Sequence, residues 1–409
     1  MKPLSMDTII LLLLGTASVS RLDRLVAAPT VIILGAYVLL DLVAAPADDG
    51  GIARRVRRVK LTLVLLAISL VVVLPTLSGM LLRRSTAPWL YVHDGAIQIE
   101  ESIRFLLRGE NPYAEDYLDT PLAEWDYAFP PPEVNPALYH NAYLPFVFLF
   151  SAPFYVATTW LTGWYDQRVV YLLLFLGASW LYMSHAKSAT RRLSLLAVFG
   201  LNFFGVSYVI WGGNDVFVFF WLVACTYLLG RNRTTLAAVC LGLSCASKQT
   251  AWLFVPFFLT YVWSTERQSG VLTRLRKVYP VILVPLLVIL PFLLWDMASF
   301  VDDTYLYLTG GTAFSYPITG LGFGSLILSL GIVKDEHAFF PFILFQLSVC
   351  VPLLTFLLRR QWCHATVQRC WYGYGLLLLF FTFFSRFFAD FYLGAIVNAL
   401  GLGYLSEDS

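Results

Sequence analysis

Long apolar runs separated by short polar turns make up most of this chain of 409 residues. A helix that crosses a bilayer needs about 20 apolar residues, or about 17 at the short end. Runs of this kind predict about 12 spans in the sequence. They lie near 6–20, 26–45, 61–82, 168–186, 193–211, 214–230, 234–248, 250–264, 279–295, 339–358, 371–386 and 388–405. The pattern therefore predicts an all-α polytopic membrane protein.

One long polar interval, 91–143, interrupts this pattern after the third span. It carries the only dense run of acidic residues and two of the five histidines. The run 143–161 that follows is apolar again, but it contains Pro145 and Pro153, and each proline removes a helix hydrogen-bond donor. A long polar loop between membrane helices is the first place to look for a functional site.

Composition supports the membrane class. The chain is 58% hydrophobic and 13% charged, whereas a soluble domain is roughly 25% charged. Its net charge of +2 gives no reason to expect nucleic acid as a partner. The six cysteines lie in apolar runs or in a basic loop, so they form no disulfide framework. His364 beside Cys363 lacks a second ligand pair at zinc spacing. The first apolar run is interpreted as an uncleaved span, because further spans follow at once.

Basic residues predict the orientation, because loops rich in Lys and Arg stay in the cytoplasm. The five basic clusters are 54–60, 187–192, 231–233, 267–277 and 359–369. All five are cytoplasmic only if 143–161 does not cross the membrane, so we expect this segment to be re-entrant or interfacial. The alternative is an ordinary span, which leaves Lys187, Arg191 and Arg192 outside. The predicted organisation is a helical hairpin with a basic loop (1–60) and a transmembrane domain (61–405) with a first outer loop (83–143).

With this orientation, several polar segments meet at the outer face. They are the long loop and the segments 211–215, 247–249, 296–320 and 385–386. Within the long loop, apolar residues at helical spacing predict an amphipathic helix over 95–108, lying in the membrane interface. Its polar face brings a carboxylate to the membrane surface, and Glu100 pairs with Arg104. Gly109 ends this helix, and a turn follows at 111–113.

Each charged candidate has a structural alternative. Asp94 shares a helix face with Gln98 and Glu101, but it also suits the N-cap position. Asp215 is a carboxylate at the outer face or the cap of the next span. Lys248 opposes the positive-inside tendency, which favours phosphate binding over snorkelling. Arg386 stands among aromatic residues and requires an anion, either a phosphate or Asp390. His93 and His140 are bases or core histidines.

The order of these features resembles the GT-C superfamily of polyprenyl-phosphate-sugar-dependent glycosyltransferases, and most of all glycosyltransferase family 87, which includes mannosyltransferases. The resemblance spans about 60–390. It rests on the outer-loop Asp, the G-x-N-P-Y turn at 109–113, the Y-x-P segment at 143–145, the G-x-N/D turn at 212–215 and the stretch LAAVCLGLSCASKQTAWLFVPFFL around Lys248. The chain departs from the usual pattern by two additional spans before the loop and by the acidity of the loop.

The resemblance implies a multi-pass cell-membrane enzyme with its active site on the extracytoplasmic face. It implies inverting transfer of a sugar, with mannose as the first choice, from a polyprenyl-phosphate donor to a glycolipid or glycan hydroxyl. Asp94 matches the catalytic base, and Lys248 and Arg386 match positions near the lipid phosphate. The expected substrate-binding residues are His93, Gln98, Glu101, Asn111, Tyr113, His140, Tyr143, Asn214 and Asp215. No cofactor is expected to be required, no metal ligands are assigned, and a divalent metal stays an open option.

Two other functions fit a polytopic chain. A transporter or lipid flippase would carry charges in mid-span and an inverted repeat with broken helices. The sequence has no evident repeat, and its polar residues gather at one face. A ligase or polymerase of lipid-linked glycans also uses a large outer loop and arginines, but its donor is a chain that is already assembled.

Overall fold

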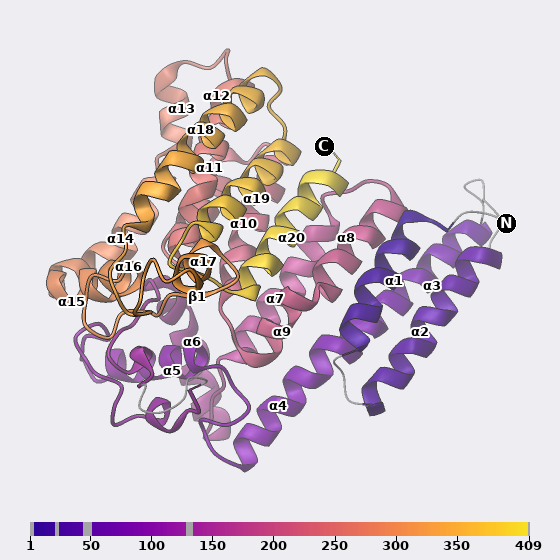
Figure 1. Cartoon of the computed structure of the whole chain (residues 1–409). Coiled ribbons are helices and arrows are strands. Elements are labelled where there is room, and N and C mark those ends of the chain that lie inside the picture. The colour runs from indigo at the N-terminus through magenta and orange to yellow at the C-terminus, as the bar shows by residue number, and fades with distance from the viewer. Residues whose placement is uncertain (1–3, 21–23, 44–50, 128–133, 408–409) are drawn as a thin grey trace.

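The chain forms an almost entirely helical bundle, seen in the computed structural model of residues 4–20, 24–43, 51–127 and 134–407 (Figure 1). The first half contains α1 (Met6–Val19), α2 (Arg24–Val43), α3 (Gly51–Ile68), α4 (Leu74–Ser85), α5 (Asp94–Leu107), α6 (Phe146–Thr162), α7 (Arg168–Met183), α8 (Ala189–Leu201) and α9 (Phe203–Trp211). The second half contains α10 (Asp215–Leu229), α11 (Thr234–Cys245), α12 (Val255–Thr265), α13 (Val271–Val278), α14 (Pro280–Trp295), α15 (Met297–Val301), α16 (Tyr307–Thr309), α17 (Phe323–Ser329), α18 (Phe342–Cys363), α19 (Val367–Phe383) and α20 (Asp390–Leu405).

Short elements complete the chain. Short 3-10 helices lie at Pro121–Glu124, Pro136–Leu138 and Gln249–Phe254, and π-helical turns lie at Ser69–Val73 and Asp302–Leu306. Two two-residue strands, β1 (Thr319–Gly320) and β2 (Phe387–Phe388), pair in parallel. The sequence pattern did not predict this pairing, because two residues carry no detectable period.

The predicted all-α membrane class is confirmed, but the count of about 12 spans is not. Within the described residues, four helical stretches are long and apolar enough to cross a membrane, and α8 with α9, bent by 50°, makes up to five. Among the described helices, α1, α6, α7, α10, α11 and α20 are shorter apolar helices of 10–17 residues. The bend follows Asn202, whose side-chain amide donates to Gly394 O and to Asn398 Oδ1, at 2.9 Å each. The end of the predicted span 26–45 lies outside the described residues.

The first basic cluster is helical rather than a loop. Residues 54–60 form early turns of α3, which continues through the π-helical turn into α4 as one 35-residue stretch. Lys60 turns inward, where its ammonium contacts Asp41 at 2.6 Å and Asp7 at 3.0 Å. A buried ammonium requires such anionic partners, so this lysine joins the first three helices together.

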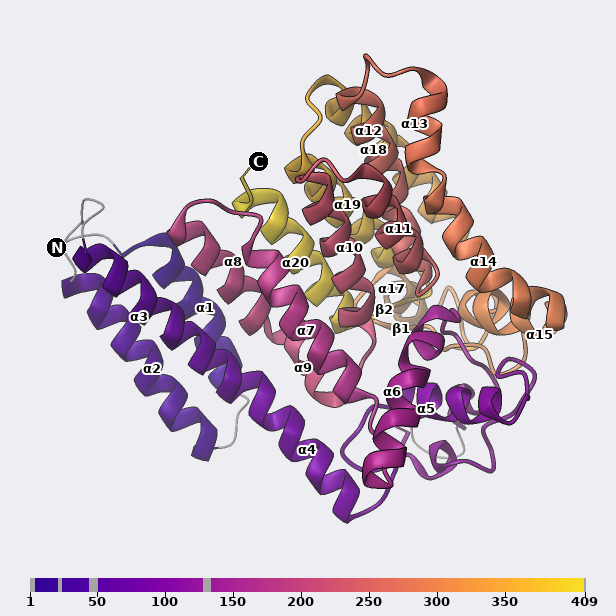
Figure 2. The ribbon, with the colours of Figure 1, turned by 180° about the vertical axis from the view of Figure 1, so that it is seen from behind.

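The polar connections separate into two ends of the bundle. We call the end formed by 86–143, 212–214, 246–249, 296–341 and 384–389 the loop end. In Figures 1 and 2 it carries α5 and α15 to α17, whereas the connection between α12 and α13 and the described C-terminus lie at the opposite end. Hydrogen bonds tie the segments of the loop end together. Examples are Asn141 N to Asp303 Oδ2 at 2.9 Å and Leu321 N to Phe388 O at 2.9 Å.

Both ends of α6 contact the loop end. The helix starts beside Ala246, and just beyond its last residue Gln167 N donates to Glu100 Oε1 at 2.8 Å. Much of its surface is exposed, and its buried residues are Val147, Phe148 and Ser151. The interfacial or re-entrant position of 143–161 in a bilayer stays a prediction.

Candidate functional site

The loop end brings together the starts of three helices. His93 and Asp94 begin α5, Asp215 begins α10 and Asp390 begins α20. The imidazole of His93 lies 5.6 Å from the ring of Tyr208, and the Tyr208 hydroxyl donates to Asp390 at 3.0 Å. Charged and aromatic side chains from distant parts of the sequence therefore share one region, which we call the site.

Asp94 is held by its neighbours at the beginning of α5. The N-cap residue of this helix is His93, in an extended conformation, so Asp94 is the first helical residue and not the cap. Its Oδ1 accepts a hydrogen bond from Gly95 N at 2.6 Å and lies 2.6 Å from Nδ1 of His93. Gly95 N also lies 3.1 Å from that Nδ1. One nitrogen cannot both donate to the carboxylate and accept from Gly95, and the short contact with a carboxylate requires the proton on Nδ1.

The histidine and the aspartate shift each other's pKa. Burial alone would raise the pKa of Asp94, but the His93 imidazolium and the N–H of Gly95 outweigh it and hold the pKa below its ordinary value. Burial alone would lower the pKa of His93, but Asp94, and to a smaller extent Asp215, raise it. The two groups therefore favour an ionised carboxylate beside a protonated imidazole.

Asn135 is a neighbour of Asp94 that the sequence analysis missed. Its Oδ1 accepts from Ala137 N at 3.0 Å, which fixes the orientation of the amide. The amide also lowers the pKa of Asp94, which places the two side chains side by side. Its Nδ2 is buried and lacks a hydrogen-bond partner within the described residues. The one sign of Asn135 that the sequence offers is its tendency to form an Asx turn before a proline.

Lys248 faces the start of α10. It lies in an extended conformation after α11, and its ammonium donates to Asp215 at 2.8 Å and to Asn214 at 3.3 Å. The same ammonium lies 4.9 Å from the centre of the Phe391 ring. Asp215 therefore serves as the partner of a lysine and does not cap α10, whose N-cap residue Asn214 makes no side-chain capping bond. The Phe391 ring also lies 5.0 Å from the ring of Tyr208, which is 5.6 Å from His93, so this pair belongs to the same region.

Tyr143 also reaches the start of α5. A Cβ atom added at Gly95 would lie 2.0 Å from the Tyr143 hydroxyl, so no side chain fits at this position. Asp94 and Asp215 both raise the pKa of Tyr143 after the larger effect of burial. Tyr143 thus lies against the start of α5, as part of the wall of the site.

Three other predicted residues hold the outer loop together. Gln98 donates to Ala137 O at 2.8 Å and to His140 O at 2.7 Å. Tyr113 donates to Tyr143 O at 2.7 Å, and Asn111 Oδ1 accepts from Tyr113 N at 3.2 Å in the predicted turn. These contacts are structural, and the substrate-binding roles of these residues stay predictions. Gly109, at a φ of +79°, follows α5 as expected.

Arg386 is buried and bonded to the backbone. Its guanidinium donates to Tyr316 O, to Ala338 O at 2.8 Å and to Glu336 O at 2.9 Å. Asp390, the expected alternative partner, accepts from Tyr208 instead. Arg386 therefore anchors the 316–338 segment beside β2, and its role at a lipid phosphate stays a prediction.

Two expectations for α5 were wrong. The helix is covered by protein on nearly all sides and does not present its carboxylates to a membrane surface, since Glu100 and Glu101 are both buried. Glu100 pairs with Arg83, while Arg104 pairs with Glu101 at 2.6 Å. The local sequence pattern identified this face of α5 as polar, but the folded outer loop covers it.

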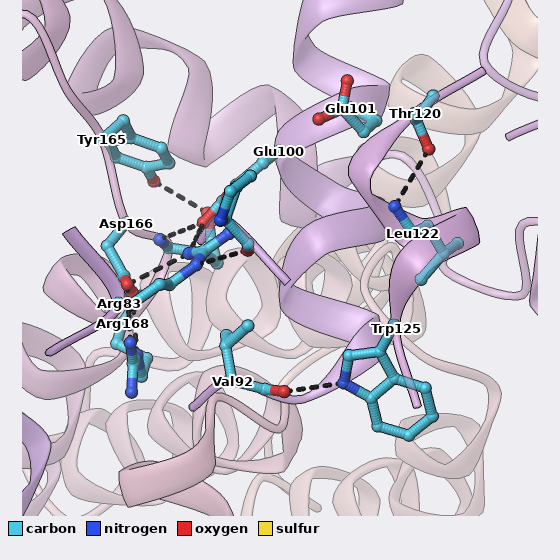
Figure 3. Close-up of polar contacts among 12 residues, drawn as sticks. Arg83, Val92, Glu100, Glu101, Thr120, Leu122, Trp125, Tyr165, Asp166 and Arg168 are labelled. Atoms are coloured by element: carbon cyan, nitrogen blue, oxygen red, sulfur yellow. Dashed lines mark hydrogen bonds and ion pairs between the residues drawn. The ribbon is translucent and has the colours of Figure 1, made fainter. Parts of the chain in front are cut away.

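A four-residue ion network lies beside α5 (Figure 3). Both oxygens of Glu100 accept from Arg83, at 2.7 and 2.8 Å, and Asp166 contacts Arg83 at 3.0 Å and Arg168 at 2.7 Å. Arg168 in turn donates to Tyr91 O at 2.8 Å, two residues before His93. Figure 3 shows Glu101 turned away from this cluster. The charged YDQR run at 165–168 was the signal that the sequence analysis missed.

His140 forms a second polar cluster, away from Asp94. It contacts Asp303 and Asp302 at 3.0 and 3.3 Å, and its ring stacks on Tyr307. The structure thus brings His93, Asp94, Tyr143, Asn214, Asp215 and Lys248 into one site, and leaves His140 in a neighbouring one.

Comparison with known proteins gives no family for this chain. No protein-family model, no curated protein and no solved structure matches it. What the site can do therefore follows from its own chemistry. It offers an ionised carboxylate to accept a proton, an ammonium to stabilise an anion, and aromatic rings to contact apolar or sugar surfaces.

Proposed function

We propose that this chain is an integral-membrane inverting glycosyltransferase. It moves a sugar, mannose in the first instance, from a polyprenyl-phosphate donor to a hydroxyl of a glycolipid or glycan at the extracytoplasmic face. The observation that carries the proposal is the combination of the His93–Asp94 pair and the Asp215–Lys248 pair in one site at the loop end. The apolar helices around the site suit a donor with a lipid tail.

Asp94 is the general base in this proposal. Its carboxylate takes the proton of the acceptor hydroxyl while the hydroxyl oxygen forms a bond to the anomeric carbon of the sugar. The bond from that carbon to the phosphate oxygen breaks, and the lipid phosphate leaves with the electron pair. Attack from the face opposite the leaving group inverts the configuration. A positioned base contributes about 10²–10⁴-fold to such a rate.

Lys248 stabilises the leaving phosphate. An ammonium has three N–H donors, and two of them go to Asn214 and Asp215. The third is available for a phosphate oxygen, where a positive charge stabilises the developing anion. Arg386 already donates to three carbonyl groups, so we assign it the positioning of the backbone around the site.

Sugar transfer in membranes tests the proposal. Membranes that contain the wild type or Asp94→Asn at matched expression receive labelled polyprenyl-phosphate mannose, with a panel of other lipid-phosphate sugars as parallel donors. We expect a labelled product with the wild type and a loss of at least about 10²-fold with Asp94→Asn. Asp119→Asn, which alters an exposed carboxylate of the same loop, is the matched control and should keep full activity.

Two outcomes contradict the proposal. Full transfer by Asp94→Asn excludes Asp94 as the base. If the wild type moves none of the labelled sugars into a covalent product but carries the lipid into sealed vesicles, the chain is a transporter instead.

A further inference from the structure

A histidine and two aspartates join two segments of the loop end. His140 follows the 3-10 turn Pro136–Leu138 of the outer loop, and Asp302 and Asp303 begin the π-helical turn after α15. Nδ1 of His140 lies 3.0 Å from Oδ1 of Asp303 and 3.3 Å from Oδ2 of Asp302. The ligand-type atoms of the three residues lie within 4.8 Å of one another.

The other ring nitrogen of His140 determines what Nδ1 can do. Nε2 lies 2.8 Å from the carbonyl oxygen of Ala313. A carbonyl only accepts, so Nε2 carries a hydrogen. In the neutral imidazole Nδ1 then has a lone pair, and this lone pair points at two carboxylates that also only accept. Three electron-pair donors facing one another require either a proton or a metal ion between them.

The arrangement around His140 is the one that metal-binding histidines adopt. Such a histidine donates its second ring nitrogen to a carbonyl or carboxylate, which fixes the tautomer and the ring plane. Ala313 provides that carbonyl, and the ring of Tyr307, stacked at 4.8 Å, holds the plane from one face. For metal–ligand bonds of about 2.1 Å, adjacent ligands lie roughly 3.0–3.4 Å apart. The two distances from Nδ1 fall in this interval.

The cluster has a path to solvent and an acidic approach. Asp303 is buried, but the side chain of Asp302 is 32% exposed. Both aspartates line an open cavity of about 820 Å³, together with the acidic side chains of Glu115 and Asp116. Within the described residues, no lysine or arginine forms an ion pair with either aspartate. The surrounding charge therefore attracts a cation.

We propose that His140, Asp302 and Asp303 bind one divalent metal ion. One imidazole and two carboxylates suit Mn²⁺ or Zn²⁺ better than Ca²⁺, which prefers an all-oxygen set. Neither Asp94 nor Asp215 belongs to the ligand set, so this site is separate from the proposed transfer site and does not depend on that proposal.

The ion links the outer loop to the segment that follows α15. Asp303 also accepts a hydrogen bond from Asn141 N at 2.9 Å, so the metal site reinforces an existing contact between the two segments. Tyr307 stacks on His140, and its carbonyl oxygen accepts a hydrogen bond from Tyr316 N at 3.1 Å. Binding of the ion holds the outer loop against the segment that follows α15.

Metal titration of the purified full-length chain in detergent tests the inference. The chain is stripped with EDTA and titrated with Mn²⁺ or Zn²⁺ by calorimetry, and bound metal is counted by elemental analysis. We expect one ion per chain and a rise in the unfolding temperature. Asp302→Asn and His140→Gln should each weaken binding at least about 10-fold and remove the rise. Asp119→Asn is the control for nonspecific acidic binding and should behave as the wild type.

Two results overturn the inference. Folded wild type that binds neither ion shows that His140 is a protonated imidazolium paired with Asp303. Unchanged affinity in Asp302→Asn, the variant at the more exposed ligand, places any bound ion elsewhere. The wild-type titration decides the question even if His140→Gln does not fold.

Discussion

At the scale of single residues, the contact between His93 and Asp94 sets the charge of the candidate base. Removing a carboxylate from water raises its pKa, and an adjacent imidazolium lowers it again. For Asp94, the His93 imidazolium and the Gly95 N–H together lower the pKa by more than burial raises it. The carboxylate therefore stays ionised over a wider range of pH than an equally buried aspartate without a histidine.

A pH profile of His93→Gln tests this balance. Glutamine removes the positive charge, so burial acts on Asp94 with less opposition and its pKa rises. The base is then protonated at a higher pH, and the acid limb of kcat/KM for sugar transfer should move to higher pH. The control is His364→Gln, an exposed position at the opposite end of the bundle. An acid limb that stays in place, or moves to lower pH, would show that His93 does not set the charge of Asp94.

At the scale of elements, α5 is the helix that positions the site. Its first turn holds Asp94, and its middle turns bury Glu100 and Glu101. The two glutamates differ in their partners. The pair of Glu100 with Arg83 is buried on both sides, whereas the side chain of Arg104, the partner of Glu101, is 43% exposed. The buried pair is therefore the one on which the position of α5 depends.

Stability measurements on Glu100→Gln and Glu101→Gln should separate these roles. Glu100→Gln leaves the buried guanidinium of Arg83 short of an anion, and breaking a buried pair costs about 3–5 kcal/mol. Glu101→Gln should cost less than about 1 kcal/mol, because one partner is solvent-exposed. Burial also raises the pKa of Glu101 despite Arg104, so a neutral side chain is tolerated there. Unfolding in detergent gives both values, and equal losses would contradict the assignment.

At the scale of the whole molecule, the two ends of the bundle differ in chemistry. The loop end gathers carboxylates, tyrosines and Lys248, and the opposite end gathers basic turns such as 187–192 and 267–277. Basic turns stay in the cytoplasm, so we expect the loop end to face outward. Because both ends of α6 contact the loop end, the chain can return to the outer face after α6 without crossing the membrane.

Cysteine accessibility in intact cells tests this topology. In a Cys363→Ser background, single cysteines replace Asp119, Thr162 or Lys187. The cysteines at Asp119 and Thr162 should react with an impermeant reagent from outside, because Asp119 lies in the loop end and Thr162 ends α6 beside it. The cysteine at Lys187 should react only after permeabilisation. Labelling of Lys187→Cys from outside would mean that 143–161 is an ordinary span.

The sequence by itself determined the helical class, the places of the long helices and the segments that meet at the loop end. These features follow from runs and periods of apolar residues, which are local properties. It also located the end of α5 at Gly109 and the turn at Asn111, because turn residues act over a few positions.

Only the tertiary structure decided which charges are partners. Glu100 is 17 residues from Arg83 and Lys248 is 33 from Asp215, and neither pair has a local pattern. The structure also assigned Arg386 to backbone carbonyls about 50 to 70 residues away and brought Asp302 and Asp303 to His140. Electrostatic partners depend on distance in space, which hydropathy does not encode. The number of spans also depends on how long each helix is in the folded chain, and apolar runs in the sequence do not fix this length.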